Sequence, residues 1–168
     1  MTLAPAASLF EVILAVHIMA VVVTFGVTFA FPIMFVVAAR HDPRGIPLLH
    51  RIEYTVERML VNPGLLLVVA AGIYLASKGH DWSDFFVQWG LGAVIVIGAL
   101  VGAVMIPTSK RAEALAARDL AVLAGGGERA GALSDEYRAL TRRLTIVGSA
   151  LSVLVLVTIL FMALHVGS

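Results

Sequence analysis

His17 lies well inside a long apolar segment, where ionisable side chains are costly and mark functional sites by default. At 100° per residue, Thr24 and Thr28 fall within about 20° of it, so His17, Thr24 and Thr28 form one polar stripe on a helix. We expect this stripe to face the interior of a helical bundle. His17 could ligate haem or a metal, or relay protons. Alternatively, it is a neutral imidazole that hydrogen-bonds a neighbouring helix as a packing contact.

His165, near the end of the last apolar segment, is a second candidate cofactor ligand. It could pair with His17 in a bis-histidine haem site, but the depths differ: His17 should lie about 12 Å inside the boundary and His165 within about a turn of it. Otherwise His165 is an interfacial histidine that contacts water or Glu11. By depth, the best-placed protein partners for His17 are Gln88 and Thr158.

A second set of polar residues has the spacing i, i+3 and i+7 of one helix face: His50, Glu53 and Glu57. Imidazole and carboxylate ligands suit a divalent metal ion. Arg51 and Arg58 offer ordinary ion pairing to the same residues instead. A weaker metal-like set stands in the second loop, at His80, Asp81 and Asp84.

Four long apolar runs must position these residues: 9–39, 56–77, 85–106 and 144–166. Each reaches the roughly 20 residues that cross the hydrocarbon core as a helix. The composition agrees, with 60% apolar and only 14% charged residues, against roughly 25% charged in soluble domains. The sequence therefore predicts an all-α fold, a four-helix transmembrane bundle that forms a single integral membrane domain over 1–168.

The basic residues are distributed unevenly along the chain. Of the 12 Lys and Arg residues, all but Lys78 fall in the first and third loops and their flanks. Cytoplasmic loops retain basic residues, so we expect both termini to be extracytoplasmic in a multi-pass protein of the bacterial inner membrane. Segments 46–60 and 109–124 should form short helices on the cytoplasmic interface. The chain has no cysteine, which excludes disulfides, thiolate nucleophiles and iron–sulfur clusters.

Prolines and caps predict where these helices bend or end. Pro32 should kink the first helix. The second should run continuously from near Val56 with a kink, the alternative being a break at Asn62. Pro107 should end the third helix, after which Ser109 could cap a short helix that Gly125–Gly127 stops. Ser134 should begin another helix that continues into the last span.

Four stretches resemble known bacterial membrane proteins. Leu14-Ala15-Val16-His17-Ile18 followed by Gly26 resembles the first helix of a broad set of four-helix membrane proteins. The stretches around Asn62-Pro63-Gly64, 71–76 and 86–91 look similar to one member, an uncharacterised family of predicted integral membrane proteins, over most of the chain. The same set includes the copper-resistance D membrane domain and the haem-binding four-helix type of protoporphyrinogen oxidase. In that oxidase a first-helix histidine, matched here by His17, is thought to ligate haem. The oxidase also has a basic residue near the start of its third helix, where this chain has Gln88-Trp89-Gly90.

These observations favour a non-enzymatic role, because no motif pairs a nucleophile with a base and no large extramembrane domain exists. The first expectation is an accessory subunit or a bundle that handles a small molecule, with the bilayer, a second copy or a larger membrane complex as partners, and no nucleic acid. The alternative is a b-type haem protein of redox or tetrapyrrole chemistry with His17 as axial ligand. A small transporter or channel using the polar stripe is a second alternative.

Overall fold

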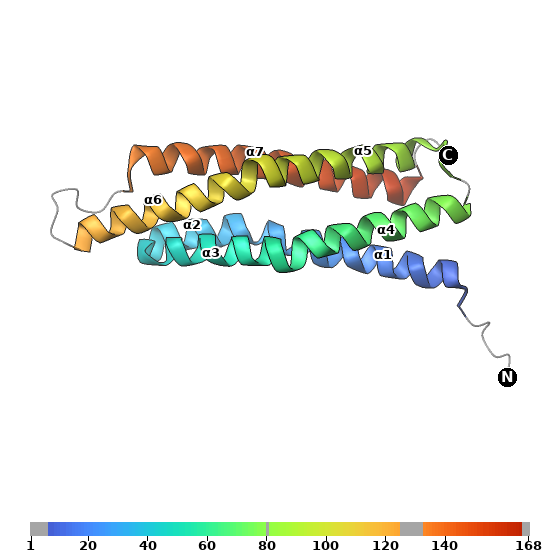
Figure 1. Ribbon diagram of the computed structural model, residues 1–168, viewed down its shortest axis with the longest axis horizontal. Coiled ribbons are helices and arrows are strands. Elements are labelled where there is room, and N and C mark those ends of the chain that lie inside the picture. Colours follow the sequence, from blue (N-terminus) through green and yellow to red (C-terminus); the bar gives the residue numbers. More distant parts are fainter. Residues whose placement is uncertain (1–6, 80, 125–132, 166–168) are drawn as a thin grey trace.

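All regular structure in the described residues, 7–79, 81–124 and 133–165 of the computed structural model, is helical. The α-helices are α1 (Leu9–Gly26), α2 (Phe31–His41), α3 (Ile46–Val56), α4 (Asn62–Gly79), α5 (Phe85–Leu100), α6 (Ile106–Ala124) and α7 (Asp135–Leu164). Most of them join end to end into four long rods that lie side by side (Figure 1). The predicted all-α four-helix bundle is therefore confirmed.

Each rod is long and apolar enough to cross a membrane. The four candidate spans are Leu9–His41, Pro43–Gly79, Phe85–Val122 and Asp135–Leu164, with 33, 37, 38 and 30 residues. Since about 20 residues suffice to cross the hydrocarbon core, every rod exceeds that thickness. Figure 1 shows the start of α1, the α4–α5 connection and the end of α7 at one end of the bundle, which we call the outer end. The α2–α3 turn, the end of α6 and the start of α7 lie at the other, inner end.

At the inner end the rods continue as a bundle. We expected 46–60 and 109–124 to be short helices on the membrane surface, the first leading into the second span. The helix α3 does run into α4, but α6 also continues α5 without a stop. The helices α3 and α6 pack closely against each other, and α6 also packs against α7. Ala112 and Ala116 of α6 are fully buried there. Their small side chains allow the close approach, so the polar inner segments extend the bundle lengthwise.

Three of the four rods contain a short stretch that is not α-helical and that ends two or three residues before a proline. A 3₁₀ turn, η1, spans Val27–Phe29, and two π-helical turns, η3 and η4, span Glu57–Val61 and Val101–Met105. A proline has no N–H to donate to the carbonyl four residues earlier, and its ring crowds that carbonyl. For Pro32, Pro63 and Pro107 these carbonyls belong to residues 28, 59 and 103, inside the three stretches.

These turns decide three expectations about helix ends. Pro32 does interrupt the first helix, and the second rod is continuous past Asn62, as predicted. The expectation that Pro107 ends the third helix is wrong, because the π turn η4 accommodates the proline and the helix continues. Ser109 is consequently not a helix cap: its side chain is buried inside the bundle.

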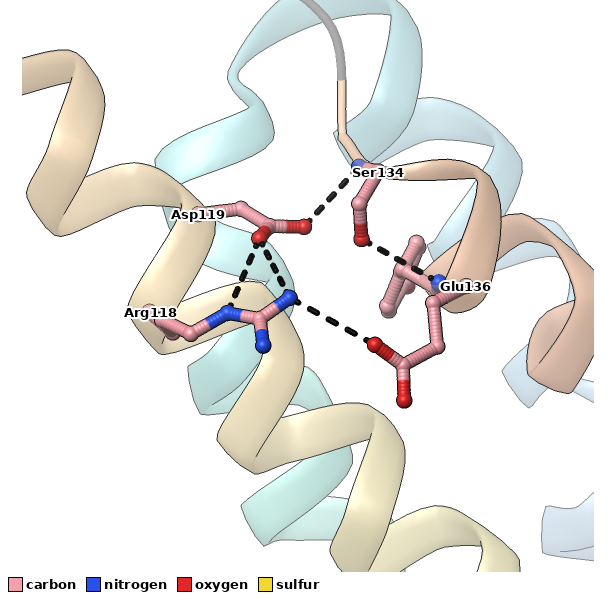
Figure 2. Close-up of polar contacts among 5 residues, drawn as sticks. Arg118, Asp119, Ser134 and Glu136 are labelled. Atoms are coloured by element: carbon pink, nitrogen blue, oxygen red, sulfur yellow. Dashed lines mark hydrogen bonds and ion pairs between the residues drawn. The ribbon is translucent and has the colours of Figure 1, made fainter. Parts of the chain in front are cut away.

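The inner ends of α6 and α7 are tied together by polar contacts (Figure 2). Ser134 caps α7 by accepting a hydrogen bond from the backbone N–H of Tyr137, as predicted. The Ser134 backbone N–H in turn donates to the Asp119 carboxylate over 2.9 Å, and Arg118 lies within 3.6 Å of Glu136. This network fixes where α7 starts. The predicted stop at Gly125–Gly127 lies outside the described residues.

Candidate functional site

His17 is held in a defined orientation between α1 and α4. Its side chain is buried, and Nδ1 lies 3.0 Å from the backbone carbonyl oxygen of Val68. A carbonyl oxygen only accepts, so Nδ1 is the donor, and in a neutral ring Nε2 then keeps its lone pair. Among the described residues no hydrogen bond to Nε2 is found. A Cβ at Gly72 would lie 3.3 Å from Cε1 of His17, so this glycine makes room for the ring.

A cavity of about 560 Å³ adjoins the His17 ring in the outer half of the bundle. Its walls come from α1, α4, α5 and α7 and are almost entirely apolar. A smaller cavity of about 50 Å³ also includes His17 and extends toward Phe25 and Ile97. The size of the large cavity is within the range of small-molecule sites, which are mostly apolar with a few placed polar groups.

The cavity also brings together the two histidines that the sequence offered as cofactor ligands. Both His17 and His165 contribute to its lining. His165 follows α7 in a left-handed conformation (φ 48°), and its ring contacts Phe86 edge-on with the centroids 5.3 Å apart. Asp81 and Trp82, which follow α4, line the cavity as well. Glu11, considered as a partner for His165, instead forms a capping box with Ser8 at the start of α1.

The polar stripe of the first helix meets α4. Thr24 is almost fully buried, with 1% of its surface exposed, and lies against Gly64 of α4. Thr28, on the 3₁₀ turn, donates to the Phe25 carbonyl of its own helix over 2.7 Å.

The prediction that His17 hydrogen-bonds to Gln88 or Thr158, on the third and fourth spans, is wrong. Thr158 accepts from the Trp89 indole N–H and Gln88 donates to the Trp82 carbonyl, while His17 bonds to α4. The reason is that α1 packs chiefly against α4, and only residue depth, not the neighbouring helix, was available from the sequence.

A second polar cluster lies in the inner half, around His50. Its ring is 98% buried, with Nε2 3.1 Å from the Tyr137 hydroxyl and Nδ1 3.4 Å from a Glu53 carboxylate oxygen. The Ser109 hydroxyl donates to that same oxygen over 3.4 Å, and Phe35 packs on the imidazole. The cluster therefore joins α2, α3, α6 and α7 at one point.

Glu57, the third residue of the proposed metal set, is buried one turn beyond Glu53. Its Oε2 and the His50 Nδ1 have no hydrogen-bond partner in the described part of the chain. Over the same residues, no group of three His, Cys, Asp or Glu side chains is arranged to hold a metal ion. Metal binding by His50, Glu53 and Glu57 stays a prediction. For the other set, His80 lies outside the described residues.

Several residues of these sites were not recognised from the sequence. Tyr137 stands among charged residues at the start of α7, and Ser109 follows a proline, so both have the pattern of exposed helix ends. Val68 contributes only a backbone carbonyl, which no side-chain pattern can reveal. A usable signal was Gly72, since a glycine inside a helix often marks a close approach.

Comparisons with protein-family models, with curated proteins and with solved structures give no match. The resemblance to the uncharacterised family and its haem- and copper-related neighbours therefore identifies no family. What the structure supports is the coarser conclusion of a four-helix protein with four candidate membrane spans.

Proposed function

We propose that this chain is a non-enzymatic, multi-pass protein of the bacterial inner membrane that binds a hydrophobic small molecule in the outer half of its bundle. The single observation that carries the proposal is the cavity of about 560 Å³ beside His17. A well-packed bundle of this size has few voids larger than a water molecule, so a cavity this large suits a bound ligand.

His17 gives this cavity its chemical selectivity. The bond from Nδ1 to Val68 fixes the ring, and Nε2 offers a lone pair to the ligand. The ligand must then present either a hydrogen-bond donor or a metal centre to Nε2, and apolar surface to the rest of the wall. Exposed residues such as Ile18 and Val22 line the cavity on the α1 side, which suits a ligand that enters from the lipid.

Mass spectrometry of the protein purified in native lipid tests the proposal. We expect wild type to release a small molecule that a His17→Leu variant lacks, and a His41→Leu variant, changed at the exposed inner end of α2, to retain it. The His17 change should cost about 0.6–2 kcal/mol, one interhelical bond, and leave the bundle folded. The proposal is wrong if wild type and the His17→Leu variant carry the same small molecules.

Haem b is a second candidate ligand, favoured by the two histidines, His17 and His165, that line the same cavity. Two properties of the cavity suit haem. Its walls are apolar, and Nε2 of His17, the nitrogen that haem iron commonly binds, has a free lone pair. No Lys or Arg of the described residues lines the cavity, so the haem propionates would have to be solvated by water rather than paired with a basic side chain. His17 and His165 are the residues that would hold the haem, and bound haem would supply an iron centre for electron transfer.

The absorption spectrum of the purified protein tests haem directly. A Soret band that is lost in His17→Ala and kept in His41→Ala would support it, and a shifted band in His165→Ala would support the second ligand. Colourless protein from haem-replete cells that takes up no added haemin would exclude haem while leaving other ligands to the first experiment.

A further inference from the structure

We propose that the outer halves of α1 and α4 move as one rigid lever about hinges at η1 and η3, and so open and close the cavity beside His17. The inference rests on the ligand-binding function proposed above and assigns a gate to that site. Three features of the bundle support this gate: the contacts that tie α1 to α4, the packing that holds the remaining helices still, and the positions at which the helices are interrupted.

The helices α1 and α4 are joined to each other along the outer half. His17 of α1 donates to the Val68 carbonyl of α4, and its ring fits against Gly72. Thr24 packs so tightly on Gly64 that no Cβ fits at that glycine. These contacts span more than a turn of each helix, so the two outer halves should rotate together.

The opposite wall is anchored. The outer half of α5 packs against α7, and the Trp89 indole N–H donates to Thr158 across that interface over 3.1 Å. The helix α7 is α-helical without interruption from Asp135 to Leu164. Contacts between the two pairs are sparse in the outer half, where the cavity separates them, while in the inner half His50, Glu53, Ser109 and Tyr137 bind them together.

Two of the three interruptions, η1 and η3, lie where a lever would need its hinges, and the third, η4, lies in the α5–α6 rod and packs against the uninterrupted α7. The turn η1 begins three residues after Thr24, and η3 ends three residues before Gly64, so both lie at one level just inside the Thr24–Gly64 contact. Short 3₁₀ and π segments within long helices are common hinge positions, because their hydrogen bonds are already displaced from the α pattern. A rotation of about 10° there would move Val12, about 22 Å from the hinge, by about 4 Å.

The absence of cysteine from the chain allows paired spin labels without background. Three exposed pairs of Cys substitutions in lipid nanodiscs test the lever by double electron–electron resonance: Val12 with Leu164 across the cavity, Val12 with Ser77 within the lever, and Leu48 with Val122 in the inner half. We expect a broad or two-peaked distance distribution for the first pair and narrow ones for the other two. Added haemin, used as an apolar probe, should shift the first pair toward its shorter distances.

Proline substitution supplies the matched comparison. The double variant Pro32→Ala with Pro63→Ala restores both missing N–H donors. The distance distribution between labels at positions 12 and 164 should then narrow to the width of the distribution between positions 12 and 77. Pro47→Ala, in the first turn of α3 and away from the hinges, should leave it unchanged.

A wild-type distribution across the cavity as narrow as that of the lever pair, or one that the double proline variant does not alter, overturns the gate. These outcomes are separable from the ligand. A broad distance distribution across the cavity in a protein that binds no small molecule would support the hinge and contradict the proposed function. A bound small molecule together with a narrow distance distribution would support the proposed function and contradict the gate.

Discussion

At the scale of single residues, the candidate site depends on glycines that bring α1 and α4 together. A glycine inside a helix lowers helix stability, and its benefit is the space it leaves for a neighbour. At Gly64 that neighbour is Thr24 and at Gly72 it is His17. The two contacts lie on either side of the Val68 carbonyl, so they set the separation at which His17 can reach it.

Gly64→Ala should therefore destabilise the protein by about 1–3 kcal/mol, because the new methyl group has to displace Thr24. Thermal unfolding in detergent measures the effect. Gly92→Ala is the control: a Cβ there meets nothing within 4 Å, and it should gain about 0.5–1 kcal/mol of helix propensity. Equal stability of the two variants would contradict the packing argument. Adding Thr24→Ala to Gly64→Ala should recover part of the loss.

Tyr137→Phe should also be destabilising, by about 1–3 kcal/mol, because it leaves Nε2 of the buried His50 without its partner. Tyr54→Phe is the matched control. Its hydroxyl makes a long contact of 3.5 Å with Arg58 and also interacts with Lys110, both on the solvent side, so the change should stay within about 0.5 kcal/mol. Chemical denaturation of both variants in the same detergent provides the comparison, and a neutral Tyr137→Phe would show that His50 is satisfied in another way.

At the scale of elements, the prolines have different consequences from those their local sequence suggests. Pro63 and Pro107 each follow a π turn, in which the hydrogen bonds shift to accommodate the N–H that the proline lacks. Both helices therefore continue past a proline that, from local sequence alone, would be expected to end them. The start of α7, in contrast, follows its local signal. Ser134 caps the helix, and Asp119 holds the cap from α6.

Ser134→Ala should lower stability by about 0.5–2 kcal/mol, the usual cost of losing a side-chain helix cap. The loss should appear first as faster amide hydrogen exchange in the first turn of α7, which the cap fixes. Ser77→Ala removes an exposed hydroxyl that bonds only to its own helix, and it should leave exchange unchanged. Unaltered exchange near Tyr137 in Ser134→Ala would refute a role for the cap.

At the scale of the whole molecule, the rods are longer than a membrane is thick, and their basic residues are concentrated at the inner end. If that end faces the cytoplasm, the His50 cluster stands at or beyond the inner membrane surface and the His17 cavity lies in the outer half of the bilayer. The orientation follows from the positive-inside rule and is a prediction.

Single cysteines in the cysteine-free chain test this orientation with a membrane-impermeant maleimide. Lys78→Cys, at the outer end of α4, should react in intact cells, whereas Arg118→Cys in α6 should react only after permeabilisation. Tags beside Thr2 and Ser168 should be labelled from outside as well. The reverse pattern would invert the topology and place the cavity on the cytoplasmic side.

The sequence by itself determined the fold class, because four apolar runs of sufficient length leave the backbone no other way to satisfy its hydrogen bonds in lipid. It also singled out His17, since a lone imidazole among apolar residues is conspicuous. It could not reveal Val68, Gly64 or the cavity, which depend on α1 packing against α4 and on the opening between the two helix pairs. Likewise, His50 meets Tyr137 across 87 positions of sequence, and only the tertiary structure brings them together, because interhelical pairing is set by side-chain shape rather than by any local pattern.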